Sequence, residues 1–476
     1  MLPTRSGEAT ETKDASLVAG LIDRARVAQA IANGYDQRRA DELACAAAWA
    51  ILEPSRNRGL AELAVEETGL GNVEDKVAKN HRKTLGLLRD LSGARSVGVI
   101  AEYPDRGLIE IARPVGVVAA LTPATNPVAT PANKIMNALK GRNAIIVAPS
   151  PRAWSTAARL VGHVHHELDR IGAPRDLVQV LPTPVHKNAT AELARLADLV
   201  VATGSQDNVR MASTSGTPTL GVGIGNVASI VDESADLAAS AKEIVASKTF
   251  DHATSCSSEN SLVIVETIAD EFLALLASHG CVLVGAVEKA ALAALMWSGH
   301  RLTDDVVGQS ATVIAERAGL PEIAAHHPRV LMVSEHGVGP GFPFSREKLS
   351  PVLAVFRVPT FEAAVALVER IYAYQGAGHS VGLHSTRADR ALALGQRLPV
   401  ARVIVNQPHC FATGGSFENG LPFSLSMGCG TWGRNHLSEN LTFRNFLNIT
   451  RVVTPIVRRE PRVDQLLAGY FERHGR

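Results

Sequence analysis

The stretch that decides the fold starts with NAIIVAP (143–149), followed by an amphipathic segment from Trp154 to Ile171 and a second apolar run, LVQVLP (177–182). NATAELARLA (188–197) and DLVVATGS (198–205) repeat this order. Short apolar runs of this kind are typical of buried strands, and the segments between them carry helical periodicity. Strands that alternate with helices indicate a parallel, doubly wound sheet, which binds ligands at the carboxyl ends of its strands.

The chain beyond this stretch follows the same plan. TLGVGIG (219–225) and ASIVD (228–232) are expected to continue the series of strands. After Asp236 the alternation starts again, with a helix at 237–247 and strands at SLVIVE (261–266), LAVFRV (353–358) and ARVIVNQ (401–407). The sequence therefore predicts a second α/β domain.

The first hundred residues have a different pattern. Apolar residues at three-to-four spacing predict helices at 15–33, 36–52 and 74–91. The segment from Arg95 to Val118 alternates and turns at Pro104-Asp105-Arg106-Gly107, which indicates a hairpin. The tail from Arg451 is expected to be extended and then helical.

Composition limits the kinds of partner. The 476 residues suggest two or three domains. Because 48 basic residues face 47 acidic ones, a nucleic-acid or membrane-surface partner is disfavoured. The polar N-terminus lacks the apolar core of a signal peptide, and no apolar run is long enough to span a membrane. With five cysteines and no disulfide pattern, we expect a cytoplasmic protein.

One cysteine is placed to react. Cys256 lies in the polar stretch FDHATSCSSEN (250–260), directly before the apolar run SLVIV (261–265). Cys45 and Cys281 lie among apolar residues and are expected to pack as small core hydrophobes. Cys410 and Cys429 lie in loop-like stretches. None of the five forms a CxxC pair, and no Cys/His spacing predicts a metal site.

Other polar positions allow two interpretations. Asn126 follows the apolar strand VGVVAAL (115–121) and could donate to an oxyanion or simply close a turn. Gly204 ends a strand where a pyrophosphate or an ordinary tight turn would fit. GVGIGN (221–226) lacks the GxGxxG spacing of a dinucleotide fingerprint. Glu347 could accept ribose hydroxyls or be a solvated loop glutamate.

Several long motifs occur in an order that resembles the aldehyde dehydrogenase superfamily along nearly the whole chain, more narrowly its coenzyme-A-acylating branch. They are TPATNP (122–127), LKGRNAIIVAPSPRA (139–153), VATGS (201–205), GVGIGN (221–226), KTFDHATSC (248–256), REKLSP (346–351), GAGHSVGLHS (376–385) and GCGTWGRNHLSEN (428–440). The resemblance implies an aldehyde dehydrogenase-like α/β fold of two doubly wound domains with a small β oligomerisation element. It also implies a homodimer or homotetramer.

The resemblance assigns roles to residues and segments. It implies Cys256 as the nucleophile and Asn126, with the Cys256 backbone N–H, as oxyanion donors. It implies that NAD or NADP contacts Thr122, Pro149, Ser150, Arg152, Gly204, Ser205, Gly223 and Glu347, and that no metal takes part. It implies a dinucleotide-binding domain over 1–96 and 114–230, a catalytic domain over 231–430, and an oligomerisation element over 97–113 and 437–476.

One departure from hydrolytic relatives points to the reaction. Hydrolytic members carry a glutamate that activates water, and aligning its stretch on GVGIGN puts Val222 in its place. Without a general base, water attacks a thioester about 10²–10⁴-fold more slowly. A thiol such as coenzyme A is a better nucleophile at neutral pH and can take the acyl group. The GCGTWG stretch (428–433) belongs to the same branch.

The aldehyde is the least determined feature. TSCSSENS (254–261) is most similar to enzymes that act on sulfoacetaldehyde, with acetaldehyde or propionaldehyde as the alternative. Arg346 or Arg434 could supply positive charge for a sulfonate, or be ordinary surface arginines. His379 could transfer a proton or order its loop. We expect a free cytoplasmic enzyme; a carboxylate-releasing dehydrogenase and a non-catalytic protein of the same fold are the competing hypotheses.

Overall fold

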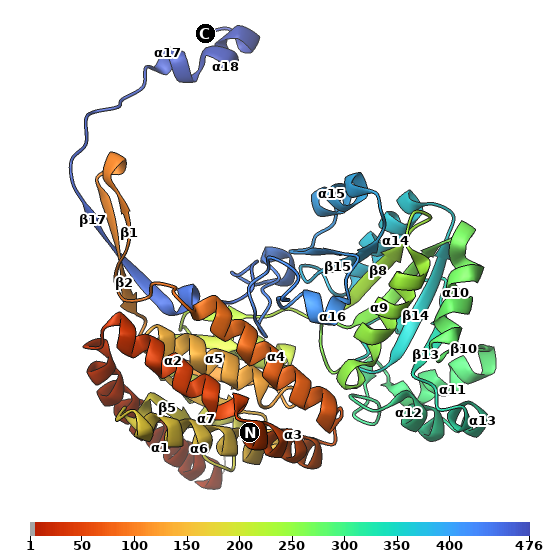
Figure 1. Cartoon of the computed structure of the whole chain (residues 1–476), viewed down its shortest axis with the longest axis horizontal. Coiled ribbons are helices and arrows are strands. Elements are labelled where there is room, and N and C mark those ends of the chain that lie inside the picture. The colour runs from red at the N-terminus through yellow and green to blue at the C-terminus, as the bar shows by residue number, and fades with distance from the viewer. Residues whose placement is uncertain (1–4) are drawn as a thin grey trace.

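The computed structural model describes residues 5–476; residues 1–4, the start of the predicted dinucleotide-binding domain, lie outside the described residues. Two lobes lie side by side, and a long arm projects from the first of them and carries the C-terminus (Figure 1). The predicted α/β fold with parallel sheets is confirmed. Among the described residues, no helix combines the length and the apolar character needed to cross a lipid bilayer.

Four helices open the chain: α1 (Arg5–Asn33), α2 (Gln37–Leu52), α3 (Pro54–Thr68) and α4 (Val73–Leu91). Three of them match the predicted helices, and α3 was missed. Its sequence begins with a proline and contains Gly59, so its helical signal is weak. Glu53 starts it nevertheless, because its carboxylate accepts the backbone N–H groups of Ser55 and Arg56.

The first lobe contains a parallel five-stranded sheet in the order β5-β4-β3-β6-β7. Its strands are β3 (Val117–Thr122), β4 (Ala144–Pro149), β5 (Val178–Val180), β6 (Leu199–Ala202) and β7 (Thr219–Gly221). The helices that follow these strands are α5 (Ala129–Lys140), α6 (Trp154–Arg170), α7 (Lys187–Leu196) and α8 (Gln206–Ser213). Every residue of β3 and β4 is buried, as expected for strands covered on both faces.

The second lobe contains a parallel seven-stranded sheet in the order β10-β13-β14-β9-β8-β15-β16. Its strands are β8 (Val227–Val231), β9 (Glu259–Val265), β10 (Cys281–Val284), β13 (Val330–Ser334), β14 (Val352–Val358), β15 (Val381–His384) and β16 (Val403–Val405). The expectation that ASIVD (228–232) continues the first series is wrong, because β8 pairs with β9 and β15 here. An apolar strand carries no local signal that tells which of two sheets it joins.

Helices surround this second sheet, together with a small hairpin. They are α9 (Leu237–Thr249), α10 (Ala269–Ser278), α11 (Ala286–Met296), α12 (Ala311–Arg317), α13 (Pro321–Ala325), α14 (Phe361–Tyr374), α15 (Ala388–Arg397) and α16 (His409–Ala412). The hairpin pairs β11 (Trp297–Ser298) with β12 (Arg301–Leu302).

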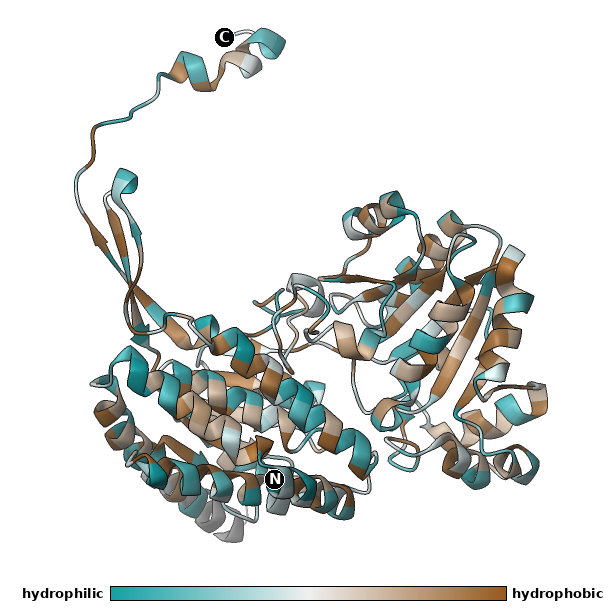
Figure 2. Ribbon diagram, viewed as in Figure 1, coloured by the Kyte–Doolittle hydropathy of each residue, from teal (hydrophilic) through white to brown (hydrophobic). Residues whose placement is uncertain are grey.

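The arm is an antiparallel sheet of β1 (Gly98–Tyr103), β2 (Leu108–Pro114) and β17 (Leu447–Val453), followed by α17 (Val463–Leu466) and α18 (Ala468–His474). The predicted hairpin at 104–107 is confirmed, and the tail is extended before it becomes helical. Hydrophobic segments recur along this projecting arm (Figure 2). Val457 is 82% exposed and Leu466 is 71% exposed, so the arm leaves apolar side chains uncovered within this chain.

Candidate active site

A cavity of about 480 Å³ brings together residues from both sheets. It contains six of the ten predicted site residues: Asn126, Gly204, Ser205, Gly223, Cys256 and Glu347. The first four follow the carboxyl ends of β3, β6 and β7, as expected for a doubly wound sheet. Cys256 and Glu347 come from loops that precede β9 and β14, so the second sheet contributes the amino ends of its strands.

The loop that carries Cys256 has an unusual backbone. Asp251, His252 and Ala253 have φ of 49°, 51° and 56°, a left-handed run that non-glycine residues avoid. Each such residue costs about 1–3 kcal/mol unless its surroundings hold it. The Asp251 carboxylate supplies such contacts, because it pairs with the Lys76 and Lys79 ammonium groups of α4.

A glycine lets a second loop approach the nucleophile closely. A Cβ added at Gly225 would lie 2.0 Å from the Cys256 carbonyl oxygen. No side chain fits there, so the loop that links β7 to β8 can pass directly behind Cys256. The Cys256 side chain itself is half-buried and faces the cavity, so a small molecule can reach it.

The Cys256 thiol is not activated by its protein surroundings alone. Burial and, less strongly, the neighbouring Glu347 carboxylate together raise its pKa to about 12. Only a small fraction of the sulfur is therefore thiolate at neutral pH. Positive charge placed in the cavity would increase this fraction, because it favours the ionised form.

Asn126 is held in one orientation. The Lys79 ammonium donates to the Asn126 Oδ1 oxygen at 2.8 Å, and Lys79 can only donate. The Asn126 amide nitrogen is therefore the end left for a ligand in the cavity. That orientation is the one an oxyanion donor requires.

The first-sheet side of the cavity suits a dinucleotide. Gly204, Ser205 and Gln206 line it at the start of α8, where a helix of eight residues presents its positive end. Burial raises the pKa of Glu347 to about 8, partly offset by the N–H of Gly225, which donates to it. A buried carboxyl of this kind can accept hydroxyl groups of a ribose.

Four predicted cofactor residues are not in the cavity wall. Thr122 and Pro149 are buried and pair across β3 and β4, and the Ser150 N–H donates to the Thr122 carbonyl. Arg152 is exposed, and its guanidinium lies 3.3 Å from the Asp304 carboxylate. These residues lie at or near the same carboxyl end of the sheet as the cavity, and the sequence motif did not distinguish them from the residues of the wall.

The position predicted to lack a base lies in the cavity wall. Val222 lines it, so an alkyl group stands there. Two carboxyl groups do line the wall, those of Asp304 and the half-buried Glu347. Arg346 also lines it, whereas Arg434 is exposed and lies outside the wall.

A second, narrow cavity of about 30 Å³ adjoins the first beside Cys256. The two share Asn126, Ser255, Leu425 and Met427. The second is also lined by Lys79, Arg82 and Lys83 of α4. Sequence reasoning missed these three because their spacing predicts an ordinary helix with a solvated charged face. The lysines of the run VEDKVAKNHRKTLGLL (73–88) recur at three-to-four spacing and share one face, but no local pattern shows that this face is buried.

The remaining cysteines and His379 are placed differently from one another. Cys281 is buried, as expected, but Cys45 is exposed; the surrounding alanine run (44–48) gives no period that would tell the inner face of α2 from the outer. Cys410 and Cys429 are both buried. His379 is buried with Nδ1 2.7 Å from the Ser380 hydroxyl, outside the cavity wall, and burial lowers its pKa to about 3. This placement favours its loop-ordering interpretation.

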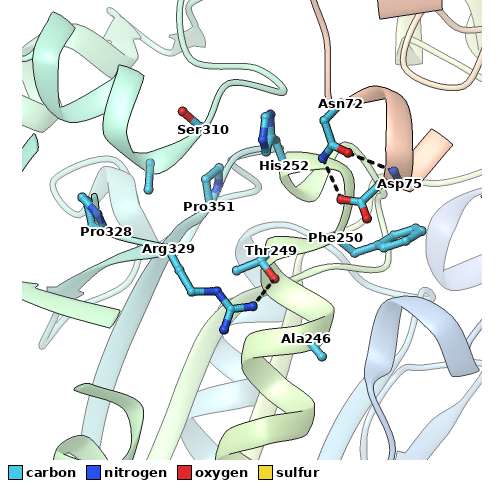
Figure 3. A pocket seen from close by; sticks show the side chains of 11 residues that line it. Asn72, Asp75, Ala246, Thr249, Phe250, His252, Ser310, Pro328, Arg329 and Pro351 are labelled. Atoms are coloured by element: carbon cyan, nitrogen blue, oxygen red, sulfur yellow. Dashed lines mark hydrogen bonds between the residues drawn. The ribbon is translucent and has the colours of Figure 1, made fainter. Parts of the chain in front are cut away.

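A third cavity, of about 430 Å³, lies where the Phe250–His252 turn meets the start of α4 and the Arg329 side chain (Figure 3). It contains none of the ten predicted site residues. Within the described part of the chain, no group of three or more His, Cys, Asp or Glu side chains is arranged to hold a metal ion.

Comparison with known proteins gives consistent matches. Residues 9–295 match the model of the aldehyde dehydrogenase family. A sulfoacetaldehyde dehydrogenase (acylating) from Cupriavidus necator is 60% identical over 475 residues, which cover 100% of this chain and 96% of that protein. One from Bilophila wadsworthia is 40% identical over 96% of this chain and 99% of its own length.

A solved structure agrees with these sequences. The acetylating aldehyde dehydrogenase from Geobacillus thermoglucosidasius superimposes with a TM-score of 0.90 at 35% identity, over 95% of this chain and 99% of that chain. The match spans both lobes, so the sequence resemblance and the architecture agree along the whole molecule. The chain belongs to the aldehyde dehydrogenase family, in its coenzyme-A-acylating branch.

Proposed function

We propose that this protein is a coenzyme-A-acylating aldehyde dehydrogenase whose aldehyde is sulfoacetaldehyde. The observation that carries the acylating reaction is the pairing of an accessible Cys256 with Val222 at the place of the water-activating glutamate. The 60% identity to a protein of that name, over the whole of this chain, supports the substrate.

In the proposed reaction, the Cys256 thiol loses its proton to solvent, and the resulting thiolate attacks the aldehyde carbon. The Asn126 amide and the Cys256 backbone N–H stabilise the oxyanion of the thiohemiacetal. A bound nicotinamide supplies the hydride acceptor. Loss of the hydride leaves a thioester on Cys256, and attack by coenzyme A releases acyl-CoA and frees the thiol.

We propose that NAD or NADP is held by the start of α8 and by Glu347. Four further residues, near the same end of the sheet, would support it: Thr122, Pro149, Ser150 and Arg152. The half-buried Glu347, together with Gly204 and Ser205, lines the cavity and supports this arrangement. Arg152 lies beside Asp304 in an exposed ion pair, and such a pair does not decide between NAD and NADP. Comparing the two cofactors at equal concentration decides between them.

We propose the domain division 1–96 with 114–226, 227–430, and 97–113 with 437–476, for cofactor binding, catalysis and oligomerisation. It differs from the sequence prediction only in moving β8 to the catalytic sheet. The exposed apolar arm supports a homodimer or homotetramer, which we propose is cytoplasmic.

The test is turnover with and without coenzyme A. Reduced cofactor should accumulate steadily only when coenzyme A is present, and acyl-CoA should form in equal amount. Cys256→Ala should abolish both aldehyde oxidation and the reverse reduction of acyl-CoA. Steady turnover without coenzyme A, with release of the free acid, would instead identify a hydrolytic dehydrogenase.

A further inference from the structure

The narrow cavity beside Cys256 carries positive charge with no carboxylate in its wall. Lys79, Arg82 and Lys83 line it, and no Asp or Glu does. Ser255, Ser257 and Ser424 also line it. An enclosed site with several cations favours an anion, because each buried cation is stabilised by a negative partner.

The lysines of α4, the helix that supplies these cations, lie on a buried face. Lys76, Lys79 and Lys83 recur at three-to-four spacing, so they share one face of α4, and all three are buried. Lysine is almost never fully buried unless it is paired. A face that only packed against the second lobe would carry apolar residues at these positions.

Two of the cations have no ionic partner in the described part of the chain. Lys83 donates to the Gly414 carbonyl at 2.7 Å, and Arg82 donates to the Phe411 carbonyl at 2.9 Å. Carbonyl groups accept hydrogen bonds but leave the net charge in place. Burial and, to a smaller extent, the charge of Arg82 together lower the pKa of Lys83 to about 7. A bound anion would reverse this effect.

Lys79 differs from Arg82 and Lys83 because it has an ionic partner. It shares the Asp251 carboxylate with Lys76 and orients the Asn126 amide at 2.8 Å. Its charge is therefore largely neutralised, and its removal would disturb the oxyanion donor. Arg82 and Lys83 are the two cations whose charge is left for a ligand.

The position of the cavity fits a substituent on the reacting aldehyde. Ser255 and Ser257 flank Cys256 in the chain, and Asn126 lies in the walls of both cavities. At about 30 Å³, with one water needing about 10–15 Å³, the site admits a small head group and not a long acyl chain. Phe411 and Met427 supply apolar wall for a methylene carbon.

We propose that Arg82 and Lys83 select sulfoacetaldehyde by binding its sulfonate, the anionic group on its second carbon, in the narrow cavity. The inference rests on the proposed function and names the residues that set its substrate. It assigns to α4 the role that the sequence suggested for Arg346 or Arg434. Arg346 faces the other cavity and donates to the His300 carbonyl, and Arg434 is exposed.

The first test compares sulfoacetaldehyde with propionaldehyde, in which a methyl group replaces the sulfonate. Arg82→Met and Lys83→Met should each lower kcat/KM for sulfoacetaldehyde by at least about 100-fold, since a buried charged partner is lost. Propionaldehyde should change by less than about threefold. Arg82→Lys should retain most of the selectivity because the charge remains. The matched control is Lys242→Met on the exposed side of α9, which should change neither substrate.

The second test needs no variant and so does not depend on folding. Ethanesulfonate should inhibit propionaldehyde oxidation by the wild-type enzyme competitively with the aldehyde, and neutral ethyl methyl sulfone should not. Equal losses for both aldehydes in the Met variants, or equal inhibition by the two compounds, would overturn the assignment. Coenzyme A dependence measured with propionaldehyde remains unaffected by this outcome, so failure of the sulfonate site is distinguishable from failure of the acylating reaction.

Discussion

At the scale of single residues, the chemistry depends on how Cys256 and Glu347 influence each other's ionisation. Burial raises the pKa of both groups, and the Glu347 charge raises the pKa of Cys256 further. Glu347 has a pKa of about 8, so its carboxyl is mostly neutral at pH 7 and charged at pH 9. Repulsion between the two groups therefore grows with pH over this interval.

Replacing Glu347 with Gln removes that charge. We expect alkylation of Cys256 by iodoacetamide to proceed at similar rates in the wild type and Glu347→Gln at pH 7, where Glu347 is protonated. At pH 9 the variant should react several-fold faster, because its thiol keeps a lower pKa. Mass spectrometry of the Cys256 peptide measures the rate, and the exposed Cys45 serves as the internal control. Identical rates at pH 9 would show that Glu347 does not act on the thiol.

At the scale of elements, α4 and the loop before β9 stabilise each other through the ion pairs of Asp251 with Lys76 and Lys79. Burial alone would raise the pKa of Asp251, but the Lys79 and Lys76 ammonium groups outweigh it and lower the pKa. This contribution to stability is present above the ordinary carboxyl pKa and is lost as the pH falls through the lowered one. These ion pairs also support the left-handed backbone at 251–253 that positions Cys256. Figure 3 shows the adjoining turn.

Asp251→Asn should be strongly destabilising, since it leaves two buried ammonium groups without a counter-charge. We expect a loss of about 3–5 kcal/mol, the range for breaking a buried ion pair. Urea denaturation followed by circular dichroism measures it. Asp389→Asn, which breaks an exposed pair with Arg387, is the matched control and should cost less than about 1 kcal/mol. A midpoint shift no larger than that of the control contradicts the structural role of the Asp251 pair.

The spacing of apolar residues predicted which segments form helices and strands better than it predicted which strands pair with one another. The strands at 144–149 and 199–202 were predicted because short apolar runs between helices have one dominant interpretation. The assignment of β8 to the second sheet depends on pairing across the molecule, which no local pattern carries. The cations of α4 were invisible as site residues for the same reason: only the packed second lobe reveals that their face is buried.

At the scale of the whole molecule, residues of both lobes line the site. The arm projects away from the lobes (Figure 1). The family motifs predicted Cys256, Asn126 and Glu347, and the structure places them in one cavity although they are far apart in the chain. No residue of the arm lines that cavity. Its exposed apolar residues require another surface, because uncovered apolar area of this kind marks an interface. We expect that surface to be a second copy of the chain.

Charged substitutions on the arm test this expectation. Val453 and Val457 are 70% and 82% exposed, so Val453→Asp/Val457→Asp should leave the folded chain intact but place carboxylates in an apolar interface. Burying such groups without partners costs several kcal/mol, enough to dissociate the assembly at micromolar concentration. Sedimentation equilibrium should then give the mass of one chain, 50.4 kDa, in place of a dimer or tetramer. Val287→Asp, at a position 79% exposed on the second lobe, should keep the wild-type mass. If the arm variant also keeps it, or if the wild type is already a monomer, the arm is not the assembly surface.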